Sequence, residues 1–220
     1  MPRKIHYDDG CATAHALDLI GERWALLIIR ELIPGPQRFS DLKAALPGIS
    51  SNILTVRLGE LEQSHIAVRR QLPPPAPAWV YELTEWGAEL ELLINSIGKW
   101  AAKSPTMAEG MPMSAASVML SFRTMFDADR AAGLSMEFDL ILNKRPHRVR
   151  IEKGKLDIEP NQLANARTTI AGDPDLVAGV VYGGLSIGDA EKAGLVIKGD
   201  REMFEAFATL FPLPEKAKKL

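Results

Sequence analysis

The fold is decided by residues 38–63, which read RFSDLKAALPGISSNILTVRLGELEQ. This stretch predicts a helix over residues 39–46, a break at Pro47-Gly48 and a second helix that begins after Ser50. The Ser50 hydroxyl can accept a hydrogen bond from an otherwise unpaired N–H group of the first turn. Leucines at positions i, i+4 and i+7 predict one buried face of the second helix: Leu54, Leu58 and Leu61. The stretch therefore predicts two helices joined by a tight turn.

Further helices are predicted on both sides of this pair. Apolar residues recur at helical spacing over residues 11–20, where Asp18 is expected on the polar side, and residues 24–32 form a nearly apolar helix. After the pair, Thr84 is predicted to cap one long helix over residues 85–103. The first half of the chain is thus mainly helical.

Two predicted strands, residues 68–72 and 79–83, complete the pattern of a winged helix-turn-helix. The prolines between them cannot donate ladder hydrogen bonds, so this segment is expected to protrude as a loop. In such a domain the second helix of the pair enters the DNA major groove, and the hairpin reaches the flanking backbone or minor groove. Asn52 and Thr55 are then expected to contact bases, since Asn pairs with adenine and Thr touches the thymine methyl group.

Basic residues around the same helices are expected to contact phosphates, which position a protein on DNA without specifying sequence. Residues 38–70 contain five Lys or Arg and three Asp or Glu, a local charge of +2 in a chain whose formal charge is −2. Hydroxyl side chains near the helix starts extend this surface. The candidate DNA-binding residues are Arg38, Ser40, Lys43, Ser50, Ser51, Asn52, Thr55, Arg57, Arg69 and Arg70.

The composition is that of a globular protein, with 220 residues, 46% hydrophobic and 25% charged. It excludes a disordered chain and a protein that coats nucleic acid by bulk charge. The single cysteine, Cys11, excludes an internal disulfide and a CxxC metal site. No targeting segment is visible, and the apolar stretch 176–188 is shorter than the ~20 residues of a membrane helix. A cytoplasmic protein without membrane attachment is expected.

The second half of the chain is expected to be a separate α+β domain. Pro, Gly and small residues mark residues 105–113 as a linker between domains at 1–104 and 114–220. A helix is predicted over residues 115–126, and helices begin near Asp173 and Asp200. The predicted strands are residues 136–142, 147–151, 156–158, 168–170 and 195–197. The fold class of the whole chain is therefore α+β.

Three runs in the first half resemble HxlR-type regulators, a branch of the MarR-like winged-helix proteins. The runs are LIGERWALLIIREL at 19–32, GPQRFSDLKAALPGISSNILTVRLGELE at 35–62 and WVYELTEWGAEL at 79–90. The resemblance covers about residues 11–100. It implies a transcription regulator that binds double-stranded DNA as a homodimer through about residues 11–20 and 86–103.

Residues 165–211, NARTTIAGDPDLVAGVVYGGLSIGDAEKAGLVIKGDREMFEAFATLF, resemble the sterol carrier protein type 2 fold. That family encloses an apolar tunnel for lipid-like ligands. The resemblance implies that the second domain binds an apolar small molecule and serves as the effector-sensing half of the regulator.

Cys11 has two interpretations. It stands at the start of a helix, where the helix dipole lowers a thiol pKa, and the resemblance implies an oxidation or electrophile sensor at this place. Alternatively it is a small buried residue that packs near the dimer interface.

The remaining polar residues indicate no enzyme, metal or cofactor. The histidines lack paired metal spacing and are expected to be solvated or to cap helices: His6, His15, His65 and His147. Three aspartates each follow a glycine and are expected to cap helices: Asp173, Asp189 and Asp200. A basic run is expected to be a solvated strand face or an auxiliary anion contact: Lys144, Arg145, Arg148, Arg150, Lys153 and Lys155.

Two functions remain open from the sequence. The first is a sequence-specific, ligand-responsive transcription regulator, which rests on the winged helix-turn-helix pattern. The second is a carrier of lipids or other hydrophobic small molecules, in which the winged helix serves for dimerisation. Val56 and Gly59 keep the second function open, because HxlR-type proteins often carry polar or basic residues at these places.

Overall fold

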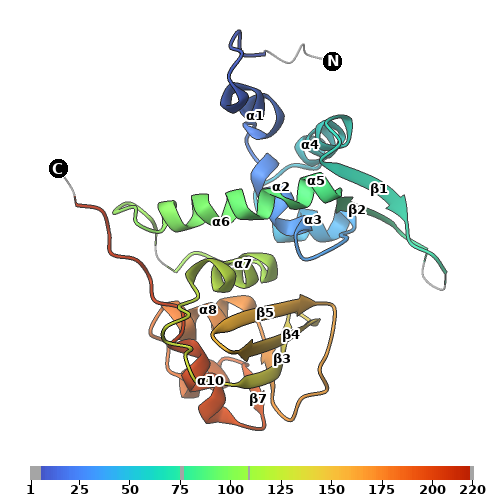
Figure 1. Ribbon diagram of the computed structural model, residues 1–220. Helices are drawn as coiled ribbons and strands as arrows, with labels where there is room; N and C mark the ends of the chain where they lie inside the picture. The colour runs from blue at the N-terminus through green and yellow to red at the C-terminus, as the bar shows by residue number, and fades with distance from the viewer. Residues whose placement is uncertain (1–5, 75–76, 109, 219–220) are drawn as a thin grey trace. The chain divides into compact units, whose positions relative to one another are not determined.

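The structure is a computed structural model that describes residues 6–74, 77–108 and 110–218. It divides into two compact units, Met1–Ile94 and Asn95–Leu220, which are described separately below (Figure 1). The division falls inside a helix, and the domain bounds at 104 and 114 stay a prediction. Among the described residues, no helix combines the length and apolar character needed to cross a membrane.

The first unit contains the predicted helices and hairpin. Its elements are α1 (Ala12–Ile20), α2 (Ala25–Leu32), α3 (Phe39–Ala45), α4 (Ser51–Gln63), β1 (Ala67–Gln71), β2 (Trp79–Leu83) and α5 (Glu85–Ala88), followed by α6 (Leu90–Ala101), which continues into the second unit. Ser50 caps α4 as predicted, since its Oγ accepts the N–H of Ile53 at 3.2 Å. The predicted leucine face of α4 is buried in the core of this unit: Leu54, Leu58 and Leu61.

The hairpin is anchored to the segment before α3. Strands β1 and β2 pair antiparallel from Ala67 opposite Leu83 to Gln71 opposite Trp79. Gln37 is buried, and it exchanges two backbone hydrogen bonds with Tyr81, of 2.9 and 2.8 Å. This bridge ties the wing to the entry of α3, so the helix-turn-helix and the wing form one rigid surface.

Two predictions for the first unit are wrong. Asp18 is buried, because its carboxylate accepts hydrogen bonds from the Tyr7 N–H and from His6 Nδ1, which lie in the segment before α1. The single helix expected over residues 85–103 is two helices. Thr84 caps α5 as predicted, but the junction at Glu89 has the tighter i→i−3 hydrogen bond, from its N–H to the carbonyl of Trp86.

The second unit is an α+β domain with a five-stranded mixed sheet in the order β5-β4-β3-β6-β7. Figure 1 shows β3, β4 and β5 side by side as an antiparallel meander, and β6 is parallel to β3. The elements are α7 (Ala115–Met125), β3 (Met136–Leu142), β4 (Arg145–Glu152), β5 (Lys155–Pro160), β6 (Thr169–Gly172), α8 (Pro174–Tyr182), α9 (Ile187–Lys192), β7 (Val196–Lys198) and α10 (Arg201–Ala208).

Phenylalanine rings fill the core of this unit. Phe122 of α7 lies 5.2 Å from Phe207 and 4.6 Å from Phe211, measured between ring centroids. Phe207 lies 4.9 Å from Phe138 of the sheet in an edge-to-face arrangement. Such pairs stabilise a core beyond the burial of their area. The sheet and its helices are therefore joined by close aromatic contacts.

Predicted caps in the second unit are confirmed in two of three cases. The carboxylates of Asp173 and Asp200 accept backbone N–H groups at the starts of α8 and α10. Asp189 does not cap a helix: Ser186 caps α9, and Asp189 lies in its first turn, where it accepts the Ser186 hydroxyl. The two side chains form a reciprocal pair at the helix start.

Strand β4 carries a buried histidine and arginines that lie near acidic residues. His147 is buried, so the expectation that it is solvated or a helix cap is wrong. Val149 and Ile151 point inward as expected from the strand period. Arg148 pairs with Glu137 of β3 at 2.5 Å, and Arg150 lies 4.0 Å from Asp157 of β5. Acidic neighbours on both adjoining strands thus compensate Arg148 and Arg150 of the basic run.

Candidate nucleic-acid interface

The exposed face of α4 is the centre of the candidate site. The helix presents the exposed residues Ser51, Asn52, Ile53, Thr55 and Val56, of which Asn52 and Val56 lie opposite its buried leucines. The capping hydrogen bond of Ser50 and the packing of the leucines hold this helix in place, so the exposed side chains project from a rigid element.

The hydroxyl groups of this surface are partly engaged within the helix. Ser50 Oγ accepts the Ile53 N–H, and Thr55 Oγ1 donates to the Ser51 carbonyl at 2.9 Å. Thr55 therefore turns its hydroxyl back toward its own helix. Asn52 has its side chain on the exposed face, where its amide can offer a donor and an acceptor to a base edge.

Arg57 is held by contacts inside the unit. Its guanidinium donates to Glu22 at 2.8 Å, to Glu60, and to the Arg23 carbonyl at 3.2 Å. The side chain is only 18% exposed. Arg57 thus links α4 to the turn between α1 and α2, where Glu22 and Arg23 lie. The sequence did not reveal this link, because the turn is more than 30 residues away along the chain.

The other basic candidates surround α4. Arg38 and Ser40 are exposed at the start of α3, and Lys43 is partly exposed on the same helix. Neither Arg38 nor Lys43 forms an ion pair within the described part of the chain. Their charges are therefore available to phosphates.

The wing holds its two arginines differently. The Arg69 guanidinium lies 4.6 Å from the centre of the Trp79 ring, a cation–π contact across the hairpin. Arg70 Nε donates to Glu82 at 2.5 Å, and this hydrogen bond raises the pKa of Arg70 above its ordinary value. Both guanidiniums are thus fixed along β1, with exposed faces toward solvent.

Cys11 is exposed at the N-cap of α1. The Thr13 N–H, the Thr13 hydroxyl and the Ala14 N–H at the start of the helix lower the pKa of its thiol. The Cys11 N–H itself donates to the Asp9 carboxylate at 2.8 Å. The thiol is therefore accessible in the single chain, and its thiolate form is favoured.

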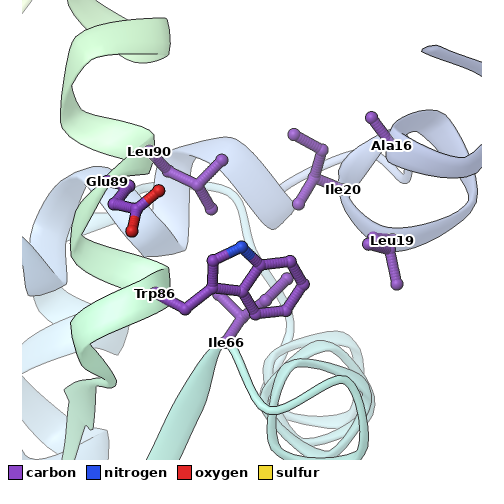
Figure 2. Close-up of a pocket in the computed structure, with 7 residues that line it drawn as sticks. All are labelled: Ala16, Leu19, Ile20, Ile66, Trp86, Glu89 and Leu90. Carbon is purple, nitrogen blue, oxygen red and sulfur yellow. The ribbon is translucent and has the colours of Figure 1, made fainter. Parts of the chain in front are cut away.

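An apolar pocket of about 230 Å³ lies between α1 and the α5–α6 junction. It is lined by Ala16, Leu19, Ile20, Ile66, Trp86, Glu89 and Leu90. Figure 2 shows Ile20 and the Trp86 ring pointing toward one another across it. Sequence reasoning did not single out this pocket, because its walls come from segments up to about 70 residues apart.

The helix α6 carries large exposed apolar side chains and has no buried residue. Trp100 is 77% exposed, and Leu93 and Ile97 are also exposed, while Leu17 is exposed on α1. Exposed apolar side chains thus occur in both segments that were expected to form a dimer.

Comparison with known proteins supports the helix-turn-helix reading. Residues 19–108 match a family model described as HxlR-like helix-turn-helix. YvaP of Bacillus subtilis, named an uncharacterized HTH-type transcriptional regulator, is 40% identical over 89 residues, which cover 40% of this chain and 82% of YvaP. YodB of the same organism, named an HTH-type transcriptional regulator, is 41% identical over 86 residues, which cover 39% of this chain and 77% of YodB.

One solved structure matches a similar share of this chain. The reduced form of YodB from B. subtilis shares 35% sequence identity, covers 46% of this chain and all of that chain, and has a TM-score of 0.40. YvaP and YodB are named as regulators rather than enzymes. The family match ends at residue 108, so nearly all of the second unit lies outside it.

Proposed function

The chain belongs to the HxlR-like helix-turn-helix family of transcriptional regulators, and from this premise we propose that it binds a specific DNA sequence as a homodimer. We further propose that its second unit receives an apolar small molecule that controls DNA binding. The observation that carries the first proposal is the rigid, exposed face of α4, which presents Asn52 beside apolar side chains.

The proposed DNA contacts follow the geometry of the site. Asn52 and Thr55 contact bases in the major groove, and Ser51 lies at the start of the same helix. Phosphates are contacted from α3 and from the wing. The proposed phosphate-contacting residues are Arg38, Ser40, Lys43, Arg69 and Arg70. Arg57 is left out of this set, because its guanidinium is engaged by three partners, Glu22, Glu60 and Arg23, and its side chain is 18% exposed, whereas Arg70 has one partner and is 43% exposed.

The proposed homodimer uses the exposed apolar side chains of α1 and α6. Leu17, Leu93, Ile97 and Trp100 support it, since burying each large apolar side chain is worth about 1.5–3 kcal/mol. The pocket beside Trp86 opens on the same helices, and the partner's side chains would cover it. Two DNA-reading surfaces in one assembly would compensate for the modest positive charge of each.

The proposed effector role of the second unit rests on its sequence resemblance to sterol carrier protein type 2. An α+β unit with an apolar interior is compatible with such a ligand. The interior between α7, α10 and the sheet is occupied by phenylalanine rings, so a ligand would have to displace some of them. Native mass spectrometry of the purified chain tests this point: a retained apolar molecule supports the proposal, and its absence after incubation with lipids contradicts it.

A titration with DNA tests the proposed function. Fluorescence anisotropy is measured with duplexes tiled across the DNA upstream of the chain's own coding sequence and with scrambled duplexes of equal composition. We expect one tile to bind more tightly than its scrambled version, with an affinity that falls steeply as salt rises, because phosphate contacts release counterions. Equal affinity for every duplex at physiological salt would contradict a specific regulator. Retention of a lipid without any DNA binding would instead favour the carrier function.

A further inference from the structure

We propose that α4 reads A·T base pairs through thymine methyl groups, with Ile53 and Val56 as the residues that contact those methyls. The inference rests on the proposed function, in which α4 enters the major groove. It adds two specificity-determining residues to Asn52 and Thr55 and states the kind of sequence that the helix selects.

Two large apolar side chains of α4 are exposed. Ile53 is 42% exposed and Val56 is 54% exposed. Together with Asn52 and Arg57 they line a shallow, mainly apolar groove of about 160 Å³. The core of the unit is already filled by the leucines on the opposite face of α4, so neither residue is required for its packing. Their methyl groups are available to an apolar partner.

The Thr55 hydroxyl is engaged within α4. It donates to the Ser51 carbonyl, and this hydrogen bond occupies the polar end of the side chain. The part of the exposed Thr55 side chain that this hydrogen bond leaves free is its methyl group. Thymine is the base that carries a methyl group in the major groove, and apolar contact with that methyl is a direct form of readout.

Helix α4 offers no unengaged Arg or Lys side chain for guanine. The commonest contact to guanine is a bidentate one from Arg or Lys to O6 and N7. Arg57 is the only basic residue in the sequence of α4, and its guanidinium is bound to Glu22, Glu60 and the Arg23 carbonyl. Asn52, by contrast, can pair with N6 and N7 of adenine. The helix therefore offers chemistry for both members of an A·T pair and little for guanine.

The experiment begins with a random duplex library. The full-length chain selects its preferred duplex, and each thymine of that duplex is then replaced singly by uracil, which lacks only the methyl group. We expect A·T pairs at the positions under α4, and a loss of affinity of about four-fold at one or two uracil positions in each half-site, as estimated for one buried methyl-sized group.

Alanine variants of Ile53 and Val56 test whether these residues cause the loss of affinity on uracil substitution. Val56→Ala and Ile53→Ala should weaken binding to the thymine duplex and leave binding to the matching uracil duplex nearly unchanged, so the ratio of the two affinities approaches one. Val196→Ala is a matched control, because Val196 is exposed on β7 of the second unit and should leave the ratio as in the wild type. Both test residues are exposed, and circular dichroism checks that the variants are folded.

The outcomes separate this inference from the proposed function. Selection of a preferred duplex in which uracil substitution has no effect, or in which α4 requires guanine, would overturn the inference and leave the regulator function standing. Failure to enrich any sequence, with equal affinity for all duplexes, would overturn the proposed function itself. A uracil effect that Val56→Ala and Ile53→Ala leave unchanged would overturn the assignment to these two residues.

Discussion

Arg57 of α4 donates a hydrogen bond of 2.8 Å to Glu22, in the turn between α1 and α2, across 35 positions of sequence. A second bond joins the same guanidinium to the Arg23 carbonyl at 3.2 Å. Helix α4 is thereby fastened to the turn that follows α1. The contact fixes the orientation of α4 within its unit, which is what a helix must have to present Asn52 reproducibly.

Replacing Arg57 should therefore change stability more than phosphate binding. We expect Arg57→Ala to lower the free energy of unfolding by about 1–3 kcal/mol, the range for hydrogen bonds that involve charged groups. The slope of log affinity against log salt should stay as in the wild type. Lys43→Ala is the comparison variant, and it should lower that slope by about one per protomer, or about two for the dimer, while leaving urea unfolding unchanged. A reduced salt slope in Arg57→Ala with unchanged stability would show that Arg57 contacts phosphate.

Replacement by alanine should change the free energy of unfolding in opposite directions at two glycines of the first unit. A Cβ added at Gly87 would lie 2.0 Å from the backbone carbonyl oxygen of Ile66, so Gly87→Ala must displace α5 from the start of β1. We expect a loss of about 1–3 kcal/mol in unfolding free energy from this overpacking. Urea unfolding followed by tryptophan fluorescence measures it, since Trp86 is the neighbouring residue.

Gly59→Ala is the matched control for this experiment. A Cβ added at Gly59 meets no atom within 4 Å, and the residue lies inside α4. Alanine should stabilise the helix by about 0.5–1 kcal/mol, because glycine loses more backbone freedom on folding. Equal effects of the two substitutions would contradict the close packing of α5 on β1.

The stability of the second unit should fall as pH decreases below about 6.5, the ordinary pKa of histidine. Burial lowers the pKa of His147, although its Nδ1 lies 3.2 Å from the Leu140 carbonyl oxygen. The unfolded chain then takes up a proton at a pH where the folded chain keeps His147 neutral, so acid favours unfolding until the folded pKa is reached. Above pH 6.5 the contribution to stability is fully present.

Hydrogen exchange of peptides from β3 and β4, measured between pH 7.5 and 5 and corrected for the intrinsic pH dependence of exchange, checks this prediction. Protection should decrease with acid in the wild type and much less in His147→Gln. The same decrease in both proteins would assign the acid sensitivity to another group.

The Cys11 thiol should react faster than an ordinary cysteine at neutral pH. It is exposed, and its pKa is lowered by Thr13 and by the first turn of α1. We expect alkylation by iodoacetamide at pH 7 to be several-fold faster than that of N-acetylcysteine, because the thiolate is the nucleophile. Thr13→Val should slow the reaction. Identical rates for the chain, the variant and the free thiol would contradict an activated cysteine.

Local signals in the sequence were enough for most of the fold. Ser50, Thr84, Asp173 and Asp200 were correctly predicted as caps, because a cap depends on residues two or three positions away. The alternation of buried positions in β4 was read correctly for the same reason: Val149 and Ile151 follow the strand period.

Features that depend on distant segments were missed. Asp18 is buried because His6 and Tyr7 fold back onto it, and helical periodicity carries no information about that segment. The contact of Arg57 with Glu22 was not foreseen, because only the folded chain brings Glu22 to it. The exposure of Ile53 was likewise not singled out, whereas Val56, opposite the leucine face, was expected to be exposed and is so.

The exposed face of α4 is proposed to select a DNA sequence. The most direct measurement is the ratio of affinities for the selected duplex and a scrambled duplex, compared between the wild type and Asn52→Ala at one salt concentration. We predict that the wild type prefers the selected duplex and that the variant loses part of this preference, by about 1–3 kcal/mol, while its affinity for the scrambled duplex stays the same. An unchanged ratio, or an equal loss on both duplexes, would contradict the claim.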